Sequence, residues 1–346
     1  MNGFLKDVIS QPESLRKAIE GYLSGDNAKR MDEIADLGFE KVVFTGMGSS
    51  NFCNGSAEIL LNNSGFTSMV KSTGQLLYYE TGLLRRDTLF ILVSQSGESA
   101  EIVRLLDSIP PFCTIVAVTN NGNSTLAKRA NYLFHMNVEE EEAVSTRTYL
   151  AALVLQDLLA ASIAKCRNEI FVEGIRASVE GLASFLEGYE EVYGQLKDFL
   201  KEASYLCLAG RGHSMATVRS GALFIREVAK FPGIDFDSAE FRHGPFEMVQ
   251  PGFHGMIFAP GGPSYELNCR LASNIAEKGG KVVLVTNRPT GRASDKILVL
   301  EQKKVPEMLV PIPEIAPVQL AAAGLAEIRG FEAGKFRWSS KVTRFE

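Results

Sequence analysis

The sequence predicts an α/β protein made of two tandem domains, each a mostly parallel sheet flanked by helices, joined by long connector helices. Short runs of β-branched residues alternate with helical patterns, which is typical of parallel strands linked by crossover helices. The second half also repeats the order of the first at a nearly constant offset: Gly212 corresponds to Gly48, and Asn287 to Asn120. A constant offset over a whole subdomain indicates duplication.

In the first half we expect five strands, at 41–46, 67–72, 88–94, 114–120 and 132–137. Helical spacing between them predicts helices over 49–63, 98–109 and 124–130, and an amphipathic helix covers 1–23.

In the second half, residues 205–223 resemble 42–60, and residues 255–287 resemble 89–120. Connector helices are expected over 144–166 and 171–203. We therefore expect an N-terminal domain over 1–165 and a second domain over 166–346.

Composition excludes several classes of function. A net charge of −5 without a basic stripe argues against nucleic acid as a partner. Five scattered cysteines without a CxxC, and four histidines without ligand spacing, favour neither disulfides nor a metal site. No signal-peptide core and no run of 18 apolar residues occurs, so we expect a cytoplasmic protein without a membrane partner. The acidic run 139–142 predicts a solvated turn before a helix.

The turn SQSGES, residues 94–99, points to ligand binding. It follows a buried strand and opens a helix, and ligands of parallel sheets lie beyond the carboxyl ends of the strands. Helix N-termini attract anions, and hydroxyls and amides donate hydrogen bonds. Since the turn has no lysine, a single phosphate on a small molecule fits better than a nucleoside triphosphate. The structural alternative is an ordinary serine N-cap.

A second turn, TGMGSSN at 45–51, also follows a strand and opens a helix. It brings Gly46, Gly48, Ser49 and Ser50 to another strand end. The counterpart of SQSGES in the second half is APGGPSYE, which has lost two of the three serines and the glutamine. The serines are therefore not needed merely to make the fold. Whether the second turn is a relic or an effector site stays open.

These motifs and the duplicated halves resemble the sugar isomerase (SIS) domain family: the isomerase half of glucosamine-6-phosphate synthase, amino-sugar-phosphate deaminases and fructosamine-phosphate deglycases. The resemblance implies two flavodoxin-like domains. It also implies that the sugar phosphate is held by Ser49, Ser50, Ser94, Gln95, Ser96 and Ser99, and that Gly48, Val144 and Ser145 line the sugar.

Three catalytic residues follow from the same resemblance. The segment 220–249 resembles the catalytic stretch, in which Glu227 matches the glutamate that moves a proton between C1 and C2, and His243 the histidine that assists ring opening. Lys341 matches a lysine beside the open-chain sugar. In the family the histidine reaches a neighbouring subunit, which implies a homodimer with a shared active site. Without the motif, all three would be ordinary surface or capping residues.

The sequence departs from the synthase at two positions, where Ser220 and Phe224 replace a glutamate and a lysine. We also expect no glutamine-hydrolysing activity in this chain alone. The resulting hypothesis is an amino-sugar 6-phosphate isomerase/deaminase, converting a glucosamine-6-phosphate-like sugar to fructose 6-phosphate without metal or organic cofactor. The alternatives are a fructosamine-6-phosphate deglycase, which would need room beside Ser220 and Phe224, and a non-catalytic sugar-phosphate regulator.

Overall fold

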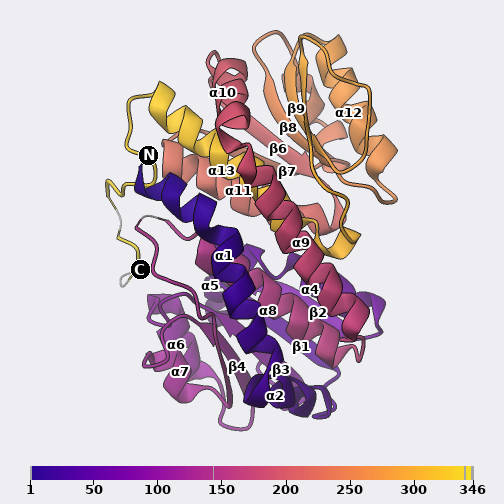
Figure 1. Cartoon of the computed structure of the whole chain (residues 1–346). Coiled ribbons are helices and arrows are strands. Elements are labelled where there is room, and N and C mark those ends of the chain that lie inside the picture. The colour runs from indigo at the N-terminus through magenta and orange to yellow at the C-terminus, as the bar shows by residue number, and fades with distance from the viewer. Residues whose placement is uncertain (1, 143, 339, 344–346) are drawn as a thin grey trace. The chain divides into compact units, whose positions relative to one another are not determined.

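The computed structural model describes residues 2–142, 144–338 and 340–343, and it divides into two compact units, each built on one sheet (Figure 1). The first-sheet unit comprises Glu13–Glu141, Ser145–Glu173 and Phe336–Glu346. The second-sheet unit comprises Met1–Pro12, Glu142–Val144 and Gly174–Lys335. The C-terminal tail thus packs with the first sheet, whereas the sequence boundary had assigned it to the second domain.

The first sheet has the strand order β2-β1-β3-β4-β5, and all four neighbouring pairs are parallel. Its strands are β1 (Lys41–Gly46), β2 (Thr67–Ser72), β3 (Thr88–Val93), β4 (Thr114–Thr119) and β5 (Tyr132–His135). The five predicted strands are confirmed, and three of them end one or two residues early. The helices of this half are α1 (Gly3–Leu23), α2 (Gly25–Ala35), α3 (Ser49–Phe52), α4 (Gly55–Asn63), α5 (Thr73–Tyr78), α6 (Ala100–Ser108), α7 (Thr125–Arg129) and α8 (Arg147–Ile163), with the 3₁₀ turn η1 (Thr81–Leu83).

The second sheet repeats this arrangement in the order β10-β9-β8-β6-β7, again with parallel neighbours. Its strands are β6 (Leu206–Gly210), β7 (Gly233–Asp237), β8 (His254–Ala259), β9 (Lys281–Thr286) and β10 (Ile297–Glu301). The remaining helices are α9 (Glu169–Glu187), α10 (Tyr189–Leu200), α11 (Met215–Ala229), α12 (Tyr265–Glu277) and α13 (Pro311–Ile328), with the 3₁₀ turns η2 (Gly212–Ser214), η3 (Glu240–Arg242), η4 (Pro245–Met248) and η5 (Glu307–Leu309). The shared strand order confirms the predicted pair of flavodoxin-like domains.

Each sheet reverses its winding at one point. In the first sheet the chain moves outward from β1 to β2 and then returns to β3 on the other side of β1. In the second sheet the same reversal falls between β6 and β8. Crossovers leave such a switch point in opposite directions and open a crevice there, which is the usual ligand position in open parallel sheets.

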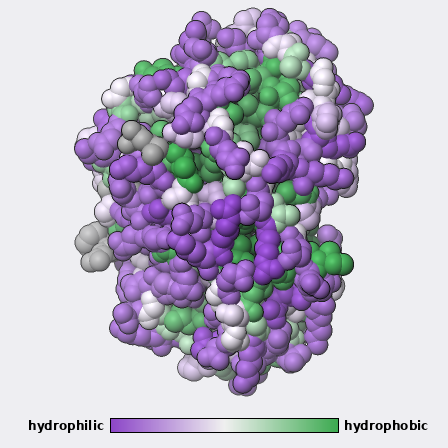
Figure 2. Space-filling model, viewed as in Figure 1, coloured by the Kyte–Doolittle hydropathy of each residue, from purple (hydrophilic) through white to green (hydrophobic). Residues whose placement is uncertain are grey.

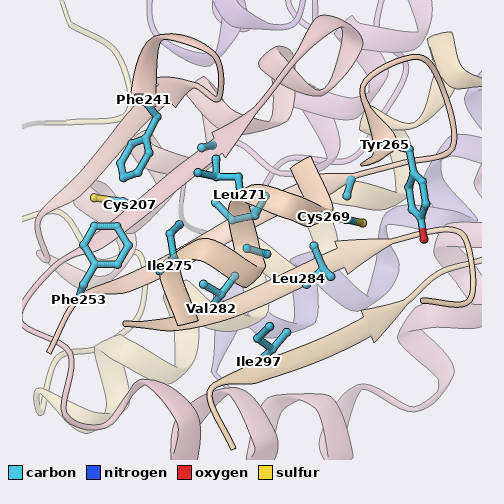
Figure 3. Packing of buried hydrophobic residues seen from close by; sticks show 14 residues of the cluster. Cys207, Phe241, Phe253, Tyr265, Cys269, Leu271, Ile275, Val282, Leu284 and Ile297 are labelled. Carbon is cyan, nitrogen blue, oxygen red and sulfur yellow. The ribbon is translucent and has the colours of Figure 1, made fainter. Parts of the chain in front are cut away.

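Apolar side chains from strands and helices form the core of each unit. In the first-sheet unit, Val43, Phe90 and Leu92 pack with Ile102 and Leu105 of α6. In the second-sheet unit, one face of the sheet packs against α12 (Figure 3). Burial of this apolar surface is the main force that holds each sheet to its helices. Hydrophilic residues cover most of the face shown in Figure 2, and apolar residues show through in separate patches.

One described stretch, Glu307–Ile328, is long and apolar enough to cross a membrane by length and composition. Its most apolar part is 94% buried inside the protein. Within its unit, α13 packs against α10 and α11. It therefore has the setting of a core helix, whose apolar surface is covered by its own chain.

Candidate functional site

The two hydroxyl-bearing turns lie side by side at the switch point of the first sheet. The first follows β1 and the second follows β3, and these strands are hydrogen-bonded neighbours. Gly46 lies where the turns meet, because a Cβ there would stand 2.7 Å from the carbonyl oxygen of Ser50 and 2.9 Å from that of Val93. Only glycine allows this approach. The hydroxyls of both turns therefore belong to one crevice.

The SQSGES turn is organised by its own hydroxyls. The Ser94 Oγ accepts a hydrogen bond from the Gly97 N–H at 3.1 Å and lies 3.4 Å from the Ser99 Oγ. The Ser96 Oγ accepts from the Glu98 N–H at 3.2 Å. The alternative of an ordinary serine N-cap is wrong for Ser99, which precedes α6 without a side-chain capping hydrogen bond, whereas Ser94 and Ser96 satisfy donors within the turn.

Gly97 and Glu98 attach the turn to the neighbouring helix α7. Gly97 has a φ of +65°, and a Cβ there would meet the Ser124 Oγ at 2.1 Å, so no side chain fits. The Glu98 carboxylate accepts from the Thr125 N–H at 2.6 Å and the Thr125 hydroxyl at 3.0 Å. These contacts hold the backbone of the turn in place before any ligand arrives.

Some of the turn's donors already have acceptors, and others remain for an anion. The N–H groups of Gly97 and Glu98 already have acceptors, and the Ala100 N–H donates to the Thr343 carbonyl at 3.1 Å. The Gln95 amide and the Ser96 hydroxyl hydrogen have no acceptor among the described residues. With the half-buried Ser49 and Ser50 of the adjacent turn, they can bind a phosphate.

Lys341 lies in the same unit as these turns. Its tail is tied to the first residue of α6 by the bond from the Ala100 N–H to Thr343. Its ammonium donates to the Glu141 carbonyl at 3.0 Å and forms an ion pair with the Glu141 carboxylate at 3.1 Å. The structure thus brings Lys341 to the helix end that begins directly after Ser99.

Glu141 corrects the prediction for the acidic run. Glu139, Glu140 and Glu142 are exposed, as expected for a solvated turn, but the Glu141 side chain is fully buried. Its position just before a helix is the only local signal, since acidic groups stabilise helix N-termini. Val144 is buried and Ser145 is half-buried, and both lie directly before α8.

Glu227 occupies the last turn of α11 in the second-sheet unit and is exposed. Desolvation by surrounding protein atoms raises the pKa of its carboxyl, while Lys230 and Arg226 lower it. A carboxylate with a raised pKa is a better proton acceptor than an ordinary surface glutamate.

His243 is also exposed, and the residues just before it pack on the face of the second sheet opposite α11. Successive residues of β6 point to opposite faces of the sheet. Leu208 approaches Gly221 of α11, so α11 covers one face. Phe241, two residues before His243, packs with Cys207, Phe253 and the α12 side chains on the other face (Figure 3). The sheet therefore separates the two predicted catalytic residues.

The two departures from the synthase pattern lie on α11 before Glu227. Ser220 and Phe224 are 0% and 2% exposed, and the Ser220 hydroxyl has no partner among the described residues. They therefore offer no accessible surface at these positions. Within the described residues, no cluster of His, Cys, Asp and Glu side chains could hold a metal ion.

The switch point of the second sheet contains carboxylates of its own chain. The Glu314 carboxyl accepts from the Ser214 hydroxyl at 2.9 Å and the Thr217 hydroxyl at 3.2 Å, at the start of α11. Glu307 fills the space beside Gly262, where a Cβ would lie 2.3 Å from a carboxylate oxygen. The Glu307 carboxyl therefore lies against the GGPSYE turn, where a carboxylate disfavours a phosphate. The sequence reasoning missed both glutamates.

Glu314 also predicts a pH dependence of stability. Burial raises its pKa from 4.5 to about 8, so the folded state binds this proton more tightly than the unfolded chain. The stabilisation of the folded state by this proton is complete below pH 4.5 and is lost as pH rises to about 8. The side chain of Glu314→Gln is neutral at every pH. At pH 9 the variant's free energy of unfolding should exceed that of wild type by about a few kcal/mol, and at pH 5 this difference should disappear.

Urea unfolding between pH 5 and 9 measures this difference. The exposed Glu301→Gln is the matched control and should follow the wild-type curve at every pH. Parallel curves for Glu314→Gln and wild type would show that the buried carboxyl does not carry the proton.

Comparisons with known proteins agree with this architecture. Residues 39–162 match the SIS domain. Over 99% of its length, the chain is 27% identical to the isomerizing glutamine–fructose-6-phosphate aminotransferase of Pyrococcus horikoshii, and it covers 57% of that protein. The chain spans a little over half the length of the curated relatives that it matches.

Two solved structures confirm the predicted fold over almost the whole chain. The C-terminal domain of glucosamine-fructose-6-phosphate aminotransferase from Francisella tularensis has a TM-score of 0.85 at 20% identity, covering 97% of this chain and 98% of that one. Glucosamine-6-phosphate deaminase from Thermotoga maritima has a TM-score of 0.79 at 20% identity, covering 98% and 99%.

Proposed function

We propose that this chain, whose residues 39–162 are a SIS domain, is a phosphosugar enzyme that deaminates an amino-sugar 6-phosphate. The reaction consumes water, shifts a proton between C1 and C2 and releases ammonia, giving fructose 6-phosphate from a substrate like glucosamine 6-phosphate. The observation that carries the proposal is the pair of hydroxyl-bearing turns at the β1/β3 switch point, with the lysine-bearing tail bound beside them. A phosphate site next to an amine suits a phosphorylated carbonyl compound.

Each residue has a distinct role in this proposal. Ser49, Ser50, Ser94, Gln95, Ser96 and Ser99 hold the phosphate, which does not react, so its binding energy positions the reacting carbons. Lys341 donates to the oxygen at C1 or C2 as the ring opens. Glu227 moves the proton between C1 and C2, and His243 protonates the ring oxygen or the leaving nitrogen. The substrate carbonyl is the electron sink, so no cofactor takes part.

We further propose that the active site is shared between two copies of the chain. Glu227 and His243 lie on opposite faces of the second sheet, so one chain does not present both to a single sugar. A two-fold dimer supplies Glu227 from one protomer and His243 from its partner. The exposure of both side chains supports this arrangement.

Buried Ser220 and Phe224 favour deamination over the deglycase alternative. A fructosamine phosphate carries an amino-acid tail that needs room beside the reacting carbon, and neither Ser220 nor Phe224 offers accessible surface for it. Glu227, His243 and Lys341 together argue against a mere regulator, which needs only the phosphate turns.

The test is to follow both reactions in parallel. Purified protein is given glucosamine 6-phosphate with ammonia as the measured product, and fructoselysine 6-phosphate with free lysine as the measured product. We expect ammonia and fructose 6-phosphate in equal amounts and no lysine. Release of lysine would establish the deglycase, and phosphosugar binding without turnover would establish the regulator.

A further inference from the structure

We propose that Glu141 is a positioning residue that fixes Lys341, and with it the C-terminal tail, beside the phosphate turns. This inference rests on the proposed function for its catalytic consequence. The contacts that carry it all lie within the first-sheet unit and join three segments distant in sequence: the residues before α8, the start of α6, and the tail at 341–343.

The two carboxylate oxygens of Glu141 do different things. Its Oε1 accepts from the Thr146 N–H at 3.0 Å, the Thr148 N–H at 2.8 Å and the Thr148 hydroxyl at 2.6 Å, so it caps the first turn of α8. Its Oε2 has no hydrogen bond to any described residue. The ion pair with Nζ of Lys341 at 3.1 Å is what compensates that oxygen.

Burial makes this ion pair specific. The Glu141 side chain is 0% exposed and that of Lys341 is 28% exposed. Among the described residues Lys341 is the cation paired with this carboxylate. A buried carboxylate that loses such a partner is strongly disfavoured, whereas an exposed pair contributes little. The Lys341 ammonium also donates to the Glu141 carbonyl, so one residue binds it twice.

The tail backbone adds a second attachment two residues further on. The Thr343 carbonyl accepts from the Ala100 N–H at the start of α6. The span between the Cα atoms of 341 and 343 is at most about 7 Å. Glu141 therefore lies within reach of the N-terminus of α6, directly after Ser99. By binding Lys341, it determines which residues of the tail lie at this helix end.

Glu141→Gln separates the positioning role from helix capping. Three donors surround Oε1, so the glutamine oxygen must take that place, and its NH₂ group then faces Lys341. Capping of α8 is retained while the side-chain ion pair with the ammonium is lost. Glu140→Gln, the exposed neighbour, removes the same charge one residue away and is the matched control.

Hydrogen exchange of the Ala100 N–H, which donates to the tail at Thr343, and a double-mutant cycle with Lys341→Met test the proposal. In Glu141→Gln we expect roughly tenfold faster exchange of this amide with an unchanged melting temperature. We also expect kcat to fall about tenfold or more, and to fall no further when Glu141→Gln is added to Lys341→Met. Glu140→Gln should match wild type throughout.

Wild-type exchange of the Ala100 N–H in Glu141→Gln overturns the proposal. So does a kcat that is unaffected, or that falls equally with and without Lys341, because a capping role alone would act independently of the lysine. The exchange measurement needs no turnover, so it decides on Glu141 even where the proposed deamination is absent.

Discussion

Replacing Glu227 with glutamine should lower kcat about a thousandfold while leaving the affinity for the phosphosugar within about threefold of wild type. The amide is nearly isosteric but does not accept the C1/C2 proton. The turns that we propose to bind the phosphate lie in the first-sheet unit and are untouched. Loss of kcat without loss of binding is the signature of an interaction made only in the transition state.

Steady-state kinetics and calorimetric titration of the phosphosugar measure the two quantities. Glu277→Gln is the matched control, because Glu277 is also an exposed glutamate at the end of a helix that flanks the second sheet. It should keep wild-type kcat. A Glu227→Gln protein with kcat within tenfold of wild type would remove Glu227 from the mechanism.

The pKa of Glu227 also sets a direction for the pH profile. Since desolvation raises it, the base is lost by protonation at a higher pH than an ordinary glutamate would be. The acidic limb of kcat/KM should therefore lie above the pH at which exposed glutamates titrate.

The fold could be predicted from sequence because its signals are local. β1, β3 and β4 are runs rich in β-branched residues, and β1 and β2 were predicted at both ends. The duplication then carried the same order to the second half. The two hydroxyl-bearing turns could be predicted for a related reason. Gly46 and Gly97 mark them in the sequence, because their backbone positions are ones that only glycine can take.

The buried glutamates could not be predicted in the same way. Glu141 is buried by contacts with Thr146, Thr148 and a lysine 200 residues away, and nothing in an acidic run indicates which member folds inward. Glu314 left a clearer signal, as the only charged residue between 310 and 325 in an apolar helix. Such an isolated carboxyl is buried with its helix and needs hydroxyl partners.

The separation of Glu227 and His243 also depended on the structure. Their spacing of 16 residues in the sequence is compatible with one site. Only the alternation of β6 side chains, with Leu208 toward α11 and Cys207 toward Phe241, shows that the sheet lies between them. This separation is the reason for the second prediction of a large effect, which concerns a heterodimer of two variants.

Two inactive proteins should restore activity when they share a dimer. Glu227→Gln and His243→Ala are each expected to retain about 1% of wild-type turnover or less. In a heterodimer of the two, one site receives both substituted residues and the other receives neither. The heterodimer should therefore regain about half of the wild-type activity per dimer.

Differently tagged chains, co-expressed and purified through both tags, give the heterodimer free of its parents. A heterodimer of wild type with Glu227→Gln is the matched control. It should also show about half activity, because each site takes one Glu227.

We propose a phosphosugar site that takes Glu227 and His243 from different chains. The direct test is ammonia release by the purified heterodimer of Glu227→Gln and His243→Ala. A shared site gives about half of wild-type activity from two inactive parents. A heterodimer as inactive as its parents, beside a half-active control, would contradict it, because each site would then draw both residues from one chain.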